Sequence, residues 1–334
     1  MFSIIAFIWA GVIALAVLIY VMLDGFDLGI ALLFPFFRTQ HDRDVMMTSV
    51  APVWDGNETW LVMGGGGLLA VFPLAYSIIL PALYAPIIAM LLGLVFRGVA
   101  FEFRWRTVRG KFLWDYAFAI GSFVATVAQG LALGTLVQGI KVTGRAYSGG
   151  WWDWLTPFSL LTALALLSGY ALLGSTWLVM KTEGPLQTRM RRFALRSAFA
   201  TLALIGVVSI WTPFLNPLFL QRWFAFPAII YTLPVPILVA ACAYWLIKSL
   251  IGTREVVPFL AAQGLFILSF VGLGISFYPY MVPTSVTIWD AATPTNSMVF
   301  LLAGAAVLVP LVLAYTAYSY WVFRGKVDMS AGYH

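Results

Sequence analysis

The chain has 334 residues, of which 62% are hydrophobic and only 10% are charged, and its mean hydropathy is +0.95. No soluble domain of this length could keep so much apolar surface away from water, so the composition excludes a soluble protein and indicates a polytopic membrane protein. The net charge of +6 does not point to nucleic acid, because the basic residues are distributed as membrane topology requires.

Nine hydrophobic stretches approach or exceed the length of about 20 residues that crosses a bilayer. They cover residues 3–34, 49–71, 74–102, 112–139, 154–180, 193–212, 226–250, 257–279 and 296–323. The first stretch is too long for the core of a signal peptide and has no cleavage site after it, so we expect it to be retained. The sequence therefore predicts an all-α protein with nine transmembrane helices in a single integral membrane domain, residues 1–334.

The basic residues predict the orientation. The connections after the first, third, fifth and seventh stretches, together with the C-terminal tail, carry 15 Lys and Arg residues. The other connections carry three, which are Lys141, Arg145 and Arg222, and Arg97 lies inside the third stretch. The positive-inside rule then places the N-terminus outside and the C-terminus in the cytoplasm.

Residues that bind metals are scarce. Cys242 is the only cysteine, which excludes a disulfide within the chain and a cysteine-based zinc or iron–sulfur site. The two histidines are His41, in a charged connection, and His334, the last residue. Haem and copper sites in membranes nearly always take histidines from the helices, so we expect no metal ligated by this chain.

Two acidic pairs interrupt the first two apolar stretches. Asp24 and Asp27 lie in LDGFDLG, and Asp55 and Glu58 lie in PVWDGNETWL, with each pair about one helical turn apart. Carboxylates in lipid are costly and usually functional. The topology puts both pairs in the cytoplasmic half of the membrane. A structural polar cluster is expected around them at the same depth, from Trp54, Asn57, Arg97 and Glu102.

Three interpretations of these acids stay open. Asp55 and Glu58 could cap a helix, because acids favour a helix N-terminus, while Glu102 is solvated. The acids could instead form an ion-paired structural cluster around Arg97. The third interpretation is a proton path from the cytoplasm, since buried carboxylates can exchange protons near neutral pH. The sequence favours this path for Asp27 and Asp55, with Asp24 and Glu58 at its mouth.

Two further stretches are unusual. YPYMVPTSVTIWD (278–290) ends in Trp289 and Asp290 and predicts an ordered outer loop, with a quinone-proximal or partner-facing role as the alternative. The glycines at 64–67 could let another backbone approach closely or could unwind the helix locally.

Six motifs resemble subunit II of the cytochrome bd-type quinol oxidases. They are DGFDLG (24–29), APVWDGNETWL (51–61), FRGVAFEFR (96–104), WDYAFAIGSF (114–123), FYPYMVPTSVTIWDA (277–291) and LVPLVLAYTAYSYW (308–321). The motifs run from the first helix to the last, so the resemblance covers nearly the whole chain. The short outer connections lean toward the cyanide-insensitive branch of this family.

The resemblance implies two four-helix bundles plus one peripheral helix, with the first bundle roughly at 1–140 and the remaining helices roughly at 150–325. It implies a heterodimer in the bacterial inner membrane with a subunit I that carries two b-type haems and one d-type haem. That subunit oxidises quinol at the outer face and reduces oxygen to water, and this chain is its haem-free relative. Asp27 and Asp55 match family positions assigned to the proton path toward the oxygen-reducing haem. A structural quinone and a small accessory subunit occur in some members.

The residues alone also allow a secondary transporter or a purely structural scaffold subunit. Transporters usually place their sites near the bilayer midplane between repeated halves, whereas these acids sit toward one face and no clear repeat is present. Haem that co-purifies with the chain would favour the oxidase over the transporter. Slowed turnover in an Asp55→Asn variant would favour the proton path over the scaffold.

Overall fold

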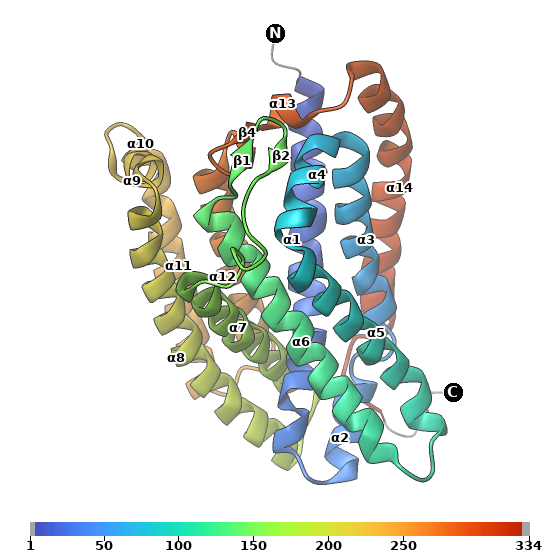
Figure 1. Cartoon of the computed structure of the whole chain (residues 1–334). Helices are drawn as coiled ribbons and strands as arrows, with labels where there is room; N and C mark the ends of the chain where they lie inside the picture. Colours follow the sequence, from blue (N-terminus) through green and yellow to red (C-terminus); the bar gives the residue numbers. More distant parts are fainter. Residues whose placement is uncertain (1–3, 329–334) are drawn as a thin grey trace.

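The computed structural model describes residues 4–328, so the predicted starting residue Ser3 and the terminal His334 lie outside the described part. Ten helices form the body of the protein (Figure 1). They are α1 (Ile4–Leu33), α3 (Trp54–Val71), α4 (Pro73–Ala82), α5 (Tyr84–Arg106), α6 (Lys111–Gln138), α7 (Pro157–Lys181), α8 (Gly184–Leu215), α11 (Pro234–Ile251), α12 (Val257–Phe277) and α14 (Thr295–Val322).

Short elements connect these helices. They are the 3-10 helix η1 (Phe34–Phe36), the helices α2 (Gln40–Thr48), α9 (Pro217–Phe224), α10 (Ala228–Thr232) and α13 (Ile288–Ala291), and the strands β1 (Val142–Thr143), β2 (Ala146–Tyr147), β3 (Tyr280–Val282) and β4 (Val286–Thr287). The strands pair as two antiparallel hairpins, β1 with β2 and β3 with β4. Both hairpins lie at one end of the helices, and α2 lies at the opposite end together with the α5–α6 connection (Figure 1).

The all-α membrane fold is confirmed. Within the described residues, eight helical segments are long and apolar enough to cross a membrane, and they correspond to eight of the nine predicted stretches. The exception is α3, whose first turns carry Asp55, Asn57 and Glu58 and whose middle is the run of four glycines. These residues lower its hydropathy, so its place as the ninth span stays a prediction.

The helices pack in two groups. In the first group α1 packs against α3 and α6, and α5 packs against α6; in the second, α7 packs against α8, and α11 against α12. Both α1 and α6 pack against α7 and so join the groups. The last helix, α14, lies at the periphery beside α1 and α3 (Figure 1). The acids predicted in α1 and α3 therefore sit where the first group meets α14.

Glycines bring α1 and α7 into backbone contact. A Cβ atom added at Gly29 would lie 1.8 Å from the Tyr170 carbonyl oxygen, and one added at Gly174 would lie 2.4 Å from the Gly29 carbonyl carbon. Any larger residue at either position would push the two helices apart, as at other small-residue crossings in membranes. This crossing fixes the part of α1 that carries Asp27.

The structure changes two details of the prediction. The predicted third stretch is divided at Leu83 into α4 and α5, because Pro86 has no N–H to donate to the carbonyl of Ala82. The glycines at 64–67 remain helical within α3, which removes the unwinding alternative. Added Cβ atoms at Gly64 and Gly67 would lie 3.3 Å from Val17 and 3.2 Å from Ile13, so these two glycines serve the close approach of α1.

Candidate functional site

A buried polar cluster joins α1, α3 and α5. Asp24 and Asp27 of α1 and Arg97 of α5 have no exposed surface. The Arg97 guanidinium donates through Nη1 to Asp24 and through Nη2 to Glu58, and so forms ion pairs with both carboxylates. The Glu58 side chain is 26% exposed, which makes it the outer member of this group.

Asp27 is held by a neutral partner. Asn57 of α3, which is 1% exposed, donates from Nδ2 to Oδ2 of Asp27 at 2.7 Å. The Tyr320 hydroxyl of α14 in turn donates to Oδ1 of Asn57 at 2.9 Å. The second oxygen of Asp27, Oδ1, has no hydrogen-bond partner among the described residues. Asp27 is therefore a fully buried carboxyl group with no direct ion pair and one free oxygen.

The cluster holds more acids than bases. Arg97 is the one cation that acts on Asp24, Asp27 and Glu58 among the described residues. Three ionised carboxylates beside one guanidinium would leave two negative charges inside the helix bundle. Uncompensated charge in such surroundings is strongly unfavourable. Binding of protons by the carboxylates relieves this excess.

The polar contacts continue deeper between the helices. Tyr20, one turn before Asp24 on α1, interacts with the Asp24 carboxylate. Gln129 of α6 donates to the Tyr20 hydroxyl at 2.8 Å and accepts from the Tyr170 hydroxyl of α7 at 2.7 Å. These contacts fix the side of the cluster that is nearer the start of α1. Tyr20, Gln129 and Tyr170 were not predicted from the sequence.

Two of the predicted cluster members lie elsewhere. Asp55 is exposed on α3, although it remains close enough to act electrostatically on Glu58. Glu102 points away from Arg97 and makes only an exposed pair with Arg106 at 3.9 Å. For Glu102 the reason is helical periodicity. It lies five positions after Arg97, and residues five positions apart on a helix lie about 140° apart around its axis. The expected pocket therefore contains Asp24, Asp27, Asn57, Glu58 and Arg97.

Trp54 supports the cluster from outside. Its ring stacks on Phe101 with centroids 4.8 Å apart and planes 6° apart, and Phe101 is itself fully buried. The contact joins the first turn of α3 to α5 close to Arg97. The stacking indicates a packing role for Trp54.

A second buried network, which the sequence did not predict, lies at the α2 end of the helices. Arg104 of α5 has no exposed surface and donates to Asp115 of α6 at 2.6 Å and to Asp44 of α2 at 2.7 Å. Arg43 pairs with Asp115 at 2.7 Å, and Lys111 pairs with Asp44 at 3.0 Å. Here the cations outnumber the acids. The only sequence signal was a dense set of charges in two neighbouring connections.

The outer loop is a folded element. Asp290 accepts a hydrogen bond from the Thr287 hydroxyl at 2.5 Å and completes the capping box of the short helix α13, whose N-cap is Thr287. Trp289 is partly buried and packs against the apolar core at the hairpin end. The backbone N–H of Thr293 donates to the Val71 carbonyl at 2.8 Å, which fixes this loop to the end of α3. These contacts agree with the structural interpretation of the loop.

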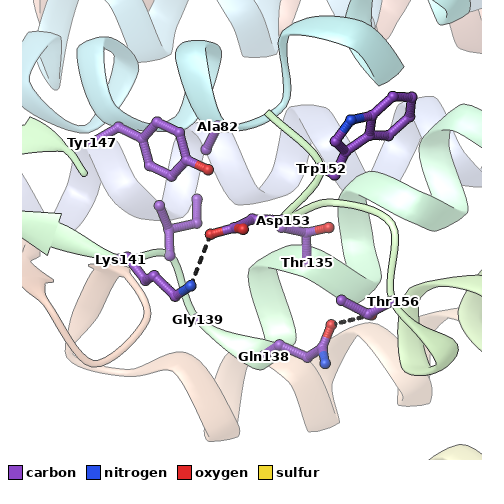
Figure 2. A pocket seen from close by; sticks show the side chains of 10 residues that line it. Ala82, Thr135, Gln138, Gly139, Lys141, Tyr147, Trp152, Asp153 and Thr156 are labelled. Atoms are coloured by element: carbon purple, nitrogen blue, oxygen red, sulfur yellow. Dashed lines mark hydrogen bonds and ion pairs between the residues drawn. The ribbon is translucent and has the colours of Figure 1, made fainter. Parts of the chain in front are cut away.

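A cavity of about 340 Å³ lies at the hairpin end (Figure 2). Two contacts join its polar groups: Lys141 pairs with Asp153 at 3.1 Å, and the Thr156 hydroxyl donates to Gln138 at 2.6 Å. The hydrogen bond from Lys141 lowers the pKa of Asp153, whereas partial burial and the Asp153 charge raise the pKa of Tyr147. We interpret these contacts as an ordered connection between α6 and α7.

Metal ligands are not gathered in the described part of the chain. Among residues 4–328 there is no group of three His, Cys, Asp or Glu side chains that could hold a metal ion. His41 lies in α2, at the end of the helices and outside the buried cluster.

Comparisons with known proteins agree with this fold. The family model "Cytochrome bd terminal oxidase subunit II" matches residues 5–323. The chain is 29% identical over 363 residues to cytochrome bd-I ubiquinol oxidase subunit 2 of Escherichia coli K12, with 98% of this chain and 96% of that protein covered. It is 26% identical over 335 residues to cytochrome bd ubiquinol oxidase subunit 2 of Bacillus subtilis 168, with 96% of both covered.

A solved structure shares the fold. A chain of the bd oxidase from Geobacillus thermodenitrificans superimposes with a TM-score of 0.75 at 18% identity, covering 96% of this chain and 99% of that one. The motifs, the helical membrane fold and a family match over nearly the full length lead to one conclusion. The chain belongs to the family of cytochrome bd terminal oxidase subunit II, and is thus a multi-pass membrane subunit of an oxidoreductase complex that also contains a subunit I.

Proposed function

We propose that this chain is the haem-free subunit of a quinol:oxygen oxidoreductase, and that its buried acids carry protons from the cytoplasm toward the haem at which subunit I reduces oxygen. The observation that carries the proposal is the composition of the cluster: three carboxylates lie around one guanidinium, and Oδ1 of Asp27 has no hydrogen-bond partner in the described part of the chain. A group with excess acid can accept and release protons without breaking the fold.

The acids form a series with graded exposure. Asp55 is exposed on α3, Glu58 is partly exposed, and Asp24 and Asp27 are fully buried. Asp24 therefore does not suit the mouth of the path, where the sequence had placed it. Glu58, which is partly exposed, keeps its predicted place at the mouth, and Arg97 connects it to Asp24. Asp55 reaches the surface separately, on the exposed face of α3.

In this proposal, protons leave the chain toward subunit I at the exposed face of α3. Asp55, Thr59, Val62 and Gly66 recur at the spacing of one helical face, and all four are exposed. A Cβ atom added at Gly66 would meet nothing within 4 Å, so another helix can approach there closely. Subunit I, seated on this face, would cover Asp55 and receive the proton from it.

The proposal includes the predicted orientation and partners. The α2 end of the helices, with the basic connections, faces the cytoplasm, and the hairpin end faces outward in the bacterial inner membrane. Subunit I carries the two b-type haems and the d-type haem, and its reaction consumes protons from the cytoplasm and thus builds a proton-motive force. Membrane lipid surrounds the apolar helices. A structural quinone and a small accessory subunit stay expectations from the family.

The alternatives differ in what they predict. The family membership favours the oxidase over a secondary transporter. A scaffold without a proton role remains the competing proposal, because the Arg97 pairs alone would also hold α1, α3 and α5 together. That proposal assigns no task to Asp27, which is the one acid of the cluster without an ion pair.

The test uses the complete complex with haem content as the internal reference. Asp27→Asn and Asp55→Asn keep side-chain volume and remove the carrier of the proton. We expect oxygen consumption per haem to fall roughly tenfold or more in each variant, in line with the loss of a proton-transferring group, while haem content stays normal. Glu102→Gln is the matched control outside the cluster. Full turnover in Asp27→Asn would instead favour the scaffold.

A further inference from the structure

The peripheral helix α14 has few polar ties to the rest of the chain. Between its limits at Thr295 and Val322, the described residues show two hydrogen bonds to other helices. At the hairpin end Trp9 donates to the Met298 carbonyl at 3.0 Å, and at the other end the Tyr320 hydroxyl donates to Asn57 at 2.9 Å. Only the second of these reaches the buried acids.

The ring of Tyr320 is held by aromatic neighbours. It lies edge-on to Phe26, with centroids 6.3 Å apart and planes at 78°, and edge-on to Trp177, at 6.1 Å and 86°. Phe26 and Trp177 are themselves stacked at 4.3 Å. Because the ring cannot turn freely, its hydroxyl is aimed at the Asn57 carbonyl oxygen.

Asn57 is the single protein group that hydrogen-bonds Asp27 among the described residues. Its amide is bound at both ends, with Nδ2 on Asp27 and Oδ1 on Tyr320. Removal of the Tyr320 hydroxyl would leave the buried amide oxygen of Asn57 without a partner, which costs free energy. The Asn57 amide would then be free to rotate. The donor to Asp27 would then no longer be fixed in direction.

We propose that Tyr320 is a positioning residue: acting through Asn57, it holds the hydrogen bond to Asp27 in the geometry that proton transfer requires. This inference rests on the proposed proton path and adds the last helix to it. Tyr320 itself exchanges no proton in this account. Its hydroxyl orients the amide, and the amide orients the carboxyl group.

Tyr320→Phe removes the hydroxyl and keeps the packing of the ring. We expect turnover per haem to fall about three- to tenfold, the equivalent of one lost buried hydrogen bond, with an unchanged KM for quinol. Tyr318→Phe is the matched control, because Tyr318 lies on the same helix and is 62% exposed. Unchanged turnover in Tyr320→Phe would overturn the inference, whereas the proposed proton path would still stand if Asp27→Asn is slow.

Two further measurements separate positioning from general loosening of the structure. In infrared difference spectra of the reduced and oxidised complex, the carboxyl band that disappears in Asp27→Asn should change frequency in Tyr320→Phe and stay in place in Tyr318→Phe. In an Asn57→Leu background, Tyr320→Phe should have no additional effect on turnover. An unshifted band, or effects that add, would contradict an action through Asn57. If no band depends on Asp27 and Asp27→Asn has full turnover, the proton path and this inference both fail.

Discussion

Two fully buried arginines on α5 have opposite surroundings. Arg97 and Arg104 lie seven residues apart, which is about two helical turns, and each binds two carboxylates from other helices. Around Arg104, the cations Arg43 and Lys111 complete the pairs with Asp44 and Asp115. Around Arg97 the described residues include no second cation, and this one guanidinium faces three acids, two of which it pairs with directly.

The comparison indicates that charge balance distinguishes a buried network that holds helices together from one that can exchange protons. A network in which each acid is paired with two cations holds α2, α5 and α6 together and has no reason to exchange protons. An acid-rich cluster deeper in the bundle gains from binding protons, because a negative excess is costly there. We therefore assign the Arg104 group as a structural clamp and the Arg97 group as the proposed proton carrier.

The largest effect should come from breaking the clamp. Arg104→Met removes the cation that Asp115 and Asp44 share, and breaking a buried ion pair on one side typically costs about 3–5 kcal/mol. We expect poor assembly and a lower temperature of half-inactivation, but normal turnover per haem in the surviving complex. Arg109→Met, at an exposed position of the next connection, is the control. A stable Arg104→Met complex with impaired turnover would reverse the two roles.

More of the Arg97 cluster than of the Arg104 clamp could be predicted from the sequence. The alternation of apolar stretches set the depth of Asp24, Asp27, Glu58 and Arg97, and these residues do meet. Depth does not determine which way a side chain faces, and therefore Asp55 and Glu102 were assigned to a pocket that they do not enter.

Contacts between distant parts of the chain could not be predicted. The Tyr320–Asn57 bond joins residues 263 positions apart, and the Arg104–Asp44 pair requires α2 to fold back beside α5 and α6. No local periodicity encodes either contact. Both depend on how whole helices pack, which a single sequence does not reveal.

A smaller effect is expected at a partly exposed ion pair near the C-terminus, which sharpens the comparison with the buried groups. Lys326 binds Glu255 at 2.6 Å and the Thr182 carbonyl at 3.0 Å, and Val327 N–H donates to the Lys181 carbonyl at 2.9 Å. The hydrogen bond from Lys326 lowers the pKa of Glu255. A lowered carboxyl pKa means that the pair stabilises the tail above the unfolded value, about 4.3, and loses this contribution as the pH falls through the folded value.

Hydrogen exchange of the C-terminal segment, corrected for intrinsic rates, should therefore be slow at pH 7 and faster near pH 3. Glu255→Gln should show the faster exchange already at pH 7. The control is Glu183→Gln, because Glu183 is an exposed acid in the connection between α7 and α8. Equal protection of the tail in Glu255→Gln and the unaltered chain would show that this pair does not hold it.

The smallest effect should come from Glu102→Gln. Its pair with Arg106 is 3.9 Å long, with side chains 51% and 81% exposed, and pairs of this kind contribute about 0–1 kcal/mol. Heat stability and turnover of the complex should both stay within error of the unaltered protein. A large loss of turnover would place Glu102 on the proton path and contradict the orientation of its side chain.

The central claim is that protons reach the oxygen-reducing haem through Asp27. The most direct measurement is the rate of proton uptake from the cytoplasmic side during a single reaction of the reduced complex with oxygen, in vesicles that hold the unaltered protein or Asp27→Asn. The account predicts that uptake slows roughly tenfold or more in the variant, while haem content and the initial binding of oxygen are unchanged. Proton uptake at the unaltered rate in Asp27→Asn would contradict it.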